Sequence, residues 1–210
     1  MTDSPNLLPE PALDLDPDTA APPDLSAPVP TSPEDNVTFR AARLLLLLAV
    51  ARATSRKIST IDRLGYLEFF ADNPFMVVDT GNDDHEGDIQ QLELAGFSPV
   101  QLSYASSGQR FASRRERLKH DLALLLSRGL TTVDETGYVT TEHGERIAEQ
   151  LDTVYADAYR TSATIVLRRL GRLSNAALQE AARARLGESW LLIDLLDDIN
   201  ATDTTTGDHT

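Results

Sequence analysis

Residues 113–140 read SRRERLKHDLALLLSRGLTTVDETGYVT, and this stretch is the most informative about the fold. Leucines recur at helical spacing in its first half, and Ser113 with Glu116 forms a capping box, the arrangement that satisfies free amides at a helix start. Gly129 is the residue type expected just past a helix end. The first half therefore predicts an amphipathic helix from Ser113 to Arg128 with a buried leucine face.

The second half of this stretch predicts a β-hairpin. Residues 130–133 and 138–140 are short runs of strand-forming residues, and residues 134–137, Asp-Glu-Thr-Gly, have the composition of a tight turn. An amphipathic helix is thus followed directly by two short antiparallel strands.

Two further helices are expected before this unit. Residues 39–53 have leucine on every side of their centre, so this helix must be enclosed all round. Ser59 and Asp62 suggest a cap for the next helix, which Pro74 ends near Asn73. The order helix, helix, helix, hairpin, helix is that of a winged helix-turn-helix domain, whose third helix would enter a DNA major groove.

The rest of the chain divides by composition. Nine of the eleven prolines lie in the first 33 residues, mixed with Asp, Ala and Ser, which predicts disorder. The predicted organisation is a disordered tail (1–36), a winged-helix domain (37–141) with an acidic insert (75–109), a helical extension (142–199) and a second disordered tail (200–210).

Several local elements are also expected. In the insert we expect an irregular chain with strands at 75–78 and 100–104. The extension should contain one long helix from near Thr141 to Leu170 and a second between a Ser174 cap and Gly187. Residues 190–199 predict a final helical turn or two.

Charge and composition exclude several classes of protein. The 210 residues carry 33 acidic and 19 basic side chains, but eight acids and no base lie in residues 1–36, and five acids and no base lie in 194–210. The region between them is nearly neutral. With no cysteine there is no disulfide or thiolate metal site, and we expect a cytoplasmic protein. The longest apolar run, 44–51, is too short to span a bilayer, so no membrane association is expected.

The candidate contact site is the densest basic patch of the chain, at the start of the predicted third helix: Arg110, Arg114, Arg115, Arg117 and Lys119. Arginine suits phosphate and guanine recognition, so one interpretation is contact with DNA. The others are contact with a protein partner, or a solvated face that pairs with the acidic insert. The neutral domain, the acidic tails and a hairpin turn without Lys or Arg all weigh against DNA.

No constellation indicates catalysis. The four histidines are scattered, and no HExxH, nucleophile elbow or phosphate-binding glycine loop is present. Residues 79–88 offer carboxylates for a hard cation but lack the spacing of an EF-hand loop. Arg168, Arg169 and Arg172 oppose the dipole of their helix, which favours a structural role. We therefore predict no catalytic site, no metal site and no cofactor.

Five segments together resemble the second type of middle component of bacterial ABC-three-component systems. They are residues 43–53, 61–69 (IDRLGYLEF), 114–118 (RRERL), 124–130 (LLLSRGL) and 173–178 (LSNAAL), and the resemblance extends over residues 39–187. Two departures stand out. The Pro/Asp-rich N-terminal tail is extra, and residues 79–93 are acidic where the family tends to carry Pro and His.

The resemblance implies a non-catalytic helical and winged-helix adaptor that links an ABC-type ATPase to a further component of a system that acts in defence against foreign DNA. The implied architecture is also similar to that of the winged-helix subunits that accompany SMC-type ATPases. The alternative function is a free-standing winged-helix DNA-binding transcriptional regulator. The sequence leaves the oligomeric state open.

Overall fold

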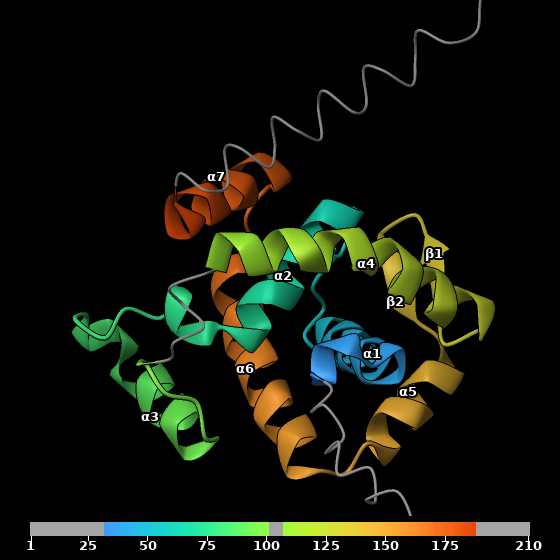
Figure 1. Cartoon of the computed structure of the whole chain (residues 1–210), viewed down its shortest axis with the longest axis horizontal. Coiled ribbons are helices and arrows are strands. Elements are labelled where there is room, and N and C mark those ends of the chain that lie inside the picture. The colour runs from blue at the N-terminus through green and yellow to red at the C-terminus, as the bar shows by residue number, and fades with distance from the viewer. Residues whose placement is uncertain (1–31, 101–106, 188–210) are drawn as a thin grey trace, which may run out of the picture. The chain divides into compact units, whose positions relative to one another are not determined.

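The computed structural model describes residues 32–100 and 107–187 (Figure 1). As expected, this part of the chain is mainly helical and has a small two-stranded antiparallel hairpin. The α-helices and strands are α1 (Val37–Ala53), α2 (Ile61–Asp72), α3 (Glu86–Leu94), α4 (Ser107–Ser127), β1 (Thr131–Asp134), β2 (Gly137–Thr140), α5 (Glu142–Gln150), α6 (Val154–Leu170) and α7 (Asn175–Leu186). Three short 3-10 helices are η1 (Pro33–Asp35), η2 (Pro74–Met76) and η3 (Asp83–His85).

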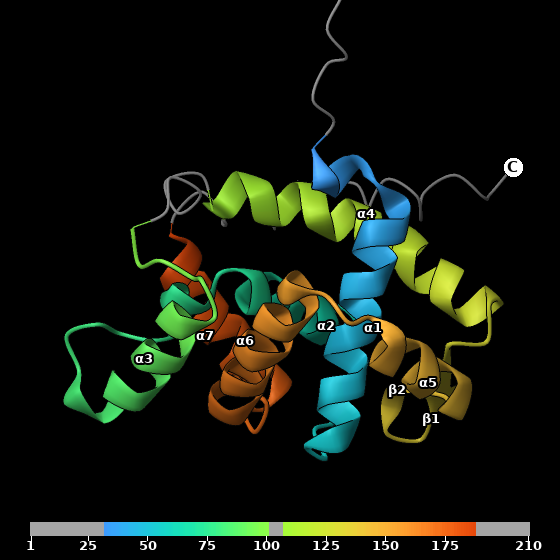
Figure 2. The same cartoon turned by 90° about the horizontal axis from the view of Figure 1, so that it is seen from below.

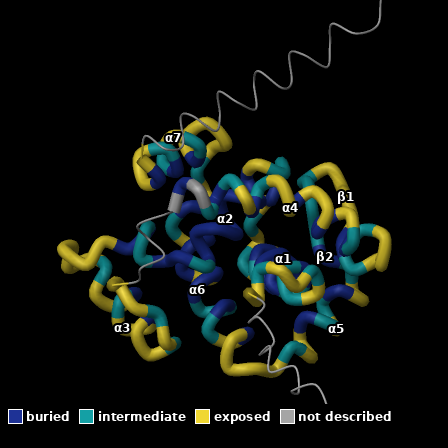
Figure 3. The backbone as a smooth tube through the Cα atoms, in the orientation of Figure 1, coloured by how far each residue is buried: buried dark blue, intermediate teal, exposed yellow. Residues whose placement is uncertain are grey.

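Helix α1 is the central helix of the core, as its sequence predicts. The side chains from Leu44 to Leu48 are all at most 2% exposed, and α2, α4, α5 and α6 pack around the helix. Figure 3 shows the buried backbone concentrated in α1, α2 and α6. Asn36 caps the helix by accepting hydrogen bonds from the backbone amides of Thr38 and Phe39. A leucine cluster on all faces is stable here because neighbouring helices cover every face.

Two predicted helix starts are wrong. For α2 the cap is Thr60, whose side chain accepts from the Arg63 amide, and not the neighbouring Ser59. Helix α4 begins at Ser107, well before the predicted capping box at Ser113. Ser113 and Glu116 therefore lie in the interior of α4, on its exposed side, and not at its start. A capping-box pattern recurs by chance wherever Ser and Glu are three residues apart on a solvent face.

The predicted hairpin is confirmed, and it is tied to the helical core. Thr131 pairs with Thr140 and Asp134 with Gly137 across the two strands. Outside the hairpin, the backbone amide of Tyr138 donates to the carbonyl oxygen of Ile58, in the connection between α1 and α2, at 2.9 Å. Gly137 has a φ of 114°, and a Cβ there would lie 2.1 Å from the Ile58 oxygen. Only glycine allows this close approach.

The insert differs from expectation. Residues 74–76 form the 3-10 helix η2 in place of the start of a predicted strand, and α3 gives the acidic segment a regular element. Leu92 of α3 is fully buried against Val78 and Ile165, in a small second apolar cluster. Of the strand predicted at 100–104, all but Val100 lies outside the described residues.

The single long helix predicted from Thr141 to Leu170 is instead two helices, α5 and α6. Thr153 caps α6 by accepting from the Ala156 amide. The guanidinium of Arg160 donates to the carbonyl oxygens of Ala148 and Leu151 at the end of α5. These bonds satisfy the backbone groups that the break exposes, so the chain can turn between the helices.

The end of the described chain follows the prediction closely. Ser174 caps α7 by accepting from the Ala177 amide, and the helix ends at Gly187. Helices α6 and α7 contribute to the same large apolar core as α1, α2 and α4, so the predicted boundary at residue 141 does not divide that core. The helix expected at 190–199 and the tail at 200–210 lie outside the described residues, as does most of the tail at 1–36.

Candidate functional site

Helix α4, which carries all five predicted contact residues, crosses α1 and α2 (Figure 1 and Figure 2). A helix advances about 100° per residue, so residues seven or four apart share an edge. Arg110, Arg114 and Arg117 therefore lie along one edge of α4, which we call the paired edge. Arg115 and Lys119 lie along the opposite edge, the open edge. The basic patch of the sequence is thus divided in two.

The side of α4 that faces solvent between these edges is not basic. Its exposed residues are Ser113, Glu116, His120 and Ala123. A helix that reads a DNA groove presents its basic and hydrogen-bonding side chains on the solvent face. In α4 the arginines are displaced from this face toward neighbouring elements.

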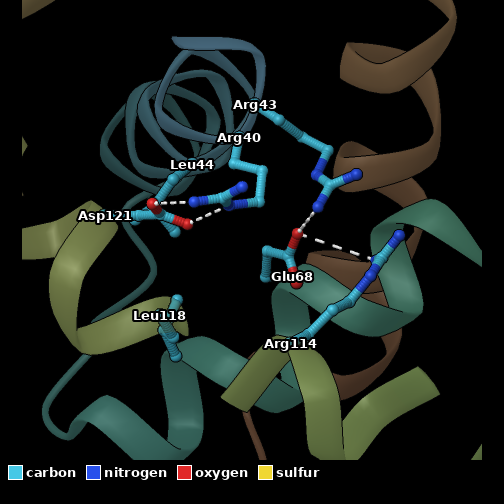
Figure 4. Close-up of a pocket in the computed structure, with 7 residues that line it drawn as sticks. All are labelled: Arg40, Arg43, Leu44, Glu68, Arg114, Leu118 and Asp121. Atoms are coloured by element: carbon cyan, nitrogen blue, oxygen red, sulfur yellow. Dashed lines mark hydrogen bonds and ion pairs between the residues drawn. The ribbon is translucent and has the colours of Figure 1, made fainter. Parts of the chain in front are cut away.

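At the paired edge, Arg114 enters a buried ion cluster centred on Glu68 of α2 (Figure 4). The Glu68 carboxylate lies 2.6 Å from Nη2 of Arg43 and 3.7 Å from Nη1 of Arg114. Their side chains are 7%, 2% and 9% exposed, respectively. Three helices, α1, α2 and α4, therefore meet at one buried carboxylate.

Two further acids complete the cluster. Glu34 of η1 places its Oε1 2.5 Å from Nη1 of Arg43 and 3.0 Å from Nη2 of Arg114. Asp72, at the end of α2, lies 2.5 Å from Nη2 of Arg114 and 3.9 Å from Nη1 of Arg43. Each guanidinium is thus shared among three carboxylates, which offsets the cost of burying its charge.

The short segment before α1 is held against α4 by the same contacts. The backbone carbonyl of Glu34 accepts from Arg40 at 2.7 Å and from Arg117 at 3.0 Å. Arg40 also forms a two-pronged ion pair with the buried Asp121 of α4. Residues 32–36, which the sequence assigned to the disordered tail, therefore form a turn fixed to the fold.

The electrostatics of the cluster follow from burial and pairing. Burial by itself would lower the pKa of Arg43 and of Arg114, but the facing carboxylates, Glu68 first, raise both above the ordinary arginine value. Burial would raise the pKa of Glu34 and Asp72, but Arg43 and Arg114 outweigh it and lower both. The Glu34 and Asp72 carboxylates and the Arg43 and Arg114 guanidinium groups are therefore charged at neutral pH.

The open edge is more loosely engaged. Arg115 pairs with the exposed Asp62 of α2 at 3.1 Å, and its side chain is 27% exposed. Lys119 is exposed, and within residues 32–100 and 107–187 it forms no ion pair. Of the five predicted residues, the structure thus places Arg114 in the buried cluster and Arg117 and Arg115 in partly exposed pairs. Arg110 is half-buried and lines two clefts, and Lys119 faces solvent.

Sequence reasoning missed the acidic half of this arrangement and its second arginine. Glu68 interrupts the apolar run Tyr66-Leu67-Glu68-Phe69-Phe70, and Arg43 directly precedes the leucine run of α1. A charged residue inside an apolar run is a signal of a buried, paired charge, because such groups are almost never buried alone. The two signals together indicate an ion pair between α1 and α2.

Among the described residues, the ion pairs of the acidic insert go to α6 and not to α4. Asp88 of the insert is buried and forms ion pairs with Arg168 and Arg169 at the end of α6. These arginines therefore hold α3 in place, in addition to opposing the helix dipole. Among the described residues, no three His, Asp or Glu side chains converge as a metal site.

Comparison with known proteins gives one match. The family model of the ABC-three component (ABC-3C) system Middle Component 2 matches residues 89–191. The family model thus identifies this part of the chain as a Middle Component 2. The match extends from α3 through α7, and so includes α4, the hairpin and the basic residues of both edges.

The comparisons with curated proteins and with solved structures give no match. No helix in the described parts of the chain is long and apolar enough to cross a membrane.

Proposed function

We propose that this Middle Component 2 protein is a non-catalytic adaptor in a bacterial ABC-type ATPase complex that acts in defence against foreign DNA. Its partners would be the ATPase and a further component of the system. The observation that carries the proposal is the family match, which assigns the chain to a system with several components. The cytoplasm is the compartment that this role requires.

The geometry of α4 favours protein contact over DNA contact. Arg114 is buried among three carboxylates of the same chain, and Arg117 and Arg115 each have an acidic partner. Binding a phosphate would require these arginines to give up ion pairs that they already form. For contact with a partner we therefore propose the exposed residues Lys119 and Arg117, with the half-buried Arg110 and Arg115 beside them.

The second candidate is a free-standing DNA-binding regulator, and the order of elements favours it. Helix α4 is followed directly by the β1–β2 hairpin, which is the arrangement of recognition helix and wing in winged-helix proteins. On this interpretation residues 37–141 form the winged-helix domain and residues 142–199 form its helical extension.

Copurification separates the two candidates. The full-length tagged chain would be recovered from its native host with and without nuclease, and its partners identified by mass spectrometry. We expect an ABC-type ATPase that remains bound after nuclease treatment. Recovery of nuclease-sensitive partners alone would contradict the adaptor proposal.

Salt dependence of duplex binding tests the regulator directly. If all five basic residues contacted phosphates, log affinity against log salt would have a slope of about −4 to −5. Because Arg114 is buried and two others are paired, we expect no binding, or a slope of about −2 or shallower. The matched variants are Lys119→Ala on the open edge and Ala123→Lys on the solvent face, which remove and add one charge.

A further inference from the structure

A cleft of about 210 Å³ lies where the end of α1 and the connection from α1 to α2 face the β1–β2 hairpin (Figure 2). Four of its lining residues are apolar: Leu48 and Ala51 of α1, and Tyr138 and Val139 of β2. Three others are basic: Arg52, Arg56 and Lys57. The cleft therefore combines an apolar lining with a cluster of positive charge, at the opposite end of α1 from η1.

The backbone after α1 holds Arg56 in a fixed position. The amide of Arg56 donates to the carbonyl oxygen of Ala51 at 2.7 Å, and the amide of Ser55 donates to that of Arg52 at 3.0 Å, which is the Schellman arrangement of a helix end. Ser55 has a φ of 54°, a left-handed conformation that residues other than glycine rarely adopt. The stem of Arg56 also packs at the end of α6, since a Cβ on Gly171 would lie 3.1 Å from its Cδ atom.

Two of the three basic residues lack a countercharge. Arg56 is half-buried, and its Nε atom is buried without a hydrogen-bond partner. A buried guanidinium nitrogen without an acceptor is costly, which indicates that an acceptor is missing from the site. Lys57 is exposed, and within residues 32–100 and 107–187 neither Arg56 nor Lys57 forms an ion pair, whereas Arg52 pairs with Glu145 of α5 at 2.7 Å. The positive charges of Arg56 and Lys57 are therefore available to a ligand.

The surroundings of the cleft favour an acidic peptide over a nucleic acid. Glu145 lies beside Arg52, and Asp134 belongs to the hairpin. Hydrogen bonds from Thr136 and, to a smaller extent, the charge of Lys57 lower the pKa of Asp134, so this carboxylate is charged at neutral pH. Carboxylates at two points near the cleft would repel a continuous phosphate backbone. A short segment with one or two carboxylates avoids this repulsion, and its apolar side chains match the apolar lining.

We propose that this cleft binds an acidic segment of a protein partner. A carboxylate of that segment accepts from Arg56 and Lys57, and a neighbouring apolar side chain packs against Leu48 and Val139. The proposal rests on the proposed function, because it gives the adaptor a second contact surface, separate from α4. On this interpretation the hairpin contacts protein, and not the DNA that the regulator interpretation assigns to it.

Fluorescence anisotropy of the full-length chain with labelled probes tests the proposal. The first probe is the blocked pentapeptide Glu-Glu-Leu-Glu-Glu, the second replaces its Leu by Ser, and the third is a single-stranded oligothymidylate. We expect saturable binding of the first peptide, weaker binding of the second and no binding of the oligothymidylate. Absence of saturable binding of the first peptide, equal affinity for both peptides, or tighter binding of the oligothymidylate would overturn the proposal.

Charge reversal locates the binding site. Arg56→Glu should weaken binding of the first peptide about tenfold or more, as expected for a largely desolvated charge pair. Lys57→Glu, at an exposed position, should weaken it in the same direction and serves where Arg56→Glu fails to fold. Arg185→Glu makes the same change at an exposed residue of α7 that does not line the cleft, and it should leave the affinity unchanged. Unchanged affinity in Arg56→Glu and Lys57→Glu, or an equal loss in Arg185→Glu, would contradict the assignment of this cleft.

Copurification distinguishes failure of the cleft from failure of the adaptor role. If an ABC-type ATPase copurifies but peptide binding does not depend on Arg56 or Lys57, the cleft proposal is wrong and the adaptor proposal stands. If peptide binding depends on these two residues but no ATPase is recovered, the cleft stands and the adaptor proposal is wrong.

Discussion

The two edges of α4 carry the same kind of side chain in different surroundings. On the paired edge Arg114 is buried among Glu34, Glu68 and Asp72, whereas on the open edge Arg115 pairs with the exposed Asp62. These two arginines are adjacent in the sequence. Because a single helical step turns a side chain by about 100°, one of them becomes part of the core and the other remains at the surface. A dense basic stretch is therefore not by itself a ligand-binding surface.

The largest difference between the edges is expected in stability. Arg114→Ala leaves the three carboxylates of the cluster with Arg43 alone, and we expect a loss of about 3–5 kcal/mol in the free energy of unfolding, as for other broken buried ion pairs. Lys119→Ala should change the same quantity by less than about 0.5 kcal/mol, because the residue is exposed. Urea unfolding followed by circular dichroism measures both.

One outcome would contradict this expected difference in stability. Similar stabilities for Arg114→Ala and Lys119→Ala would mean that the ion cluster contributes nothing net to folding. Arg114→Met controls for lost packing, since it keeps the apolar stem and removes the charge.

A smaller effect is expected from acid. The pKa values of Glu34 and Asp72 are lowered in the folded protein by Arg43 and Arg114, so both groups bind protons more tightly in the unfolded chain. Their contribution is complete at neutral pH, begins to decline near the ordinary glutamate pKa of 4.5, and is lost as the pH falls through the folded values. Stability should therefore decrease on acidification below this pH.

Glu34→Gln isolates one part of this dependence. The variant should be less stable than the wild type at neutral pH and should lose less stability on acidification, because one titrating group is gone. Urea midpoints measured across the acidic range give both quantities. As a control, Asp62→Asn changes an exposed acid of α2 that pairs with the open edge, and it should lower the stability at neutral pH less than Glu34→Gln does.

The smallest change in stability is expected when an exposed ion pair is removed. Arg117 contacts Asp35, and their side chains are 44% and 60% exposed. Arg117→Ala should cost about 0–1 kcal/mol, and most of the ion-pair part should disappear at high salt, since exposed pairs are screened. The loss in Arg114→Ala should persist at the same salt. If instead both losses vanish with salt, the distinction between a buried and an exposed edge is wrong.

Much of the fold was predictable from local pattern. The leucine run of α1, the hairpin and the Ser174 cap of α7 were predicted correctly, because each depends on residues close together in the chain. The errors lie where a distant group satisfies the backbone. The break between α5 and α6 is stabilised by Arg160, and α3 is held by Arg168 and Arg169 through Asp88.

The candidate site was predictable only in half. The high density of basic residues along the sequence identified the five basic residues of α4, but it did not show which of them are buried. That depends on Glu34, Glu68 and Asp72, which come from η1 and α2 and meet Arg114 only after α4 has packed across the core. Charge density is a property of neighbours in sequence, whereas pairing is a property of neighbours in space.

Local sequence patterns were enough to predict the helical class, the helix-then-hairpin unit and the resemblance to the middle components. Hydrophobic periodicity, turn chemistry and short motifs are local, so they can be recognised without coordinates. Three features depend on how the helices pack: α4 has a paired and an open edge, η1 is fixed to the fold, and Arg110 lines two clefts. Burial and long-range ion pairing set these features, because the cost of a buried charge depends on what the rest of the chain places around it.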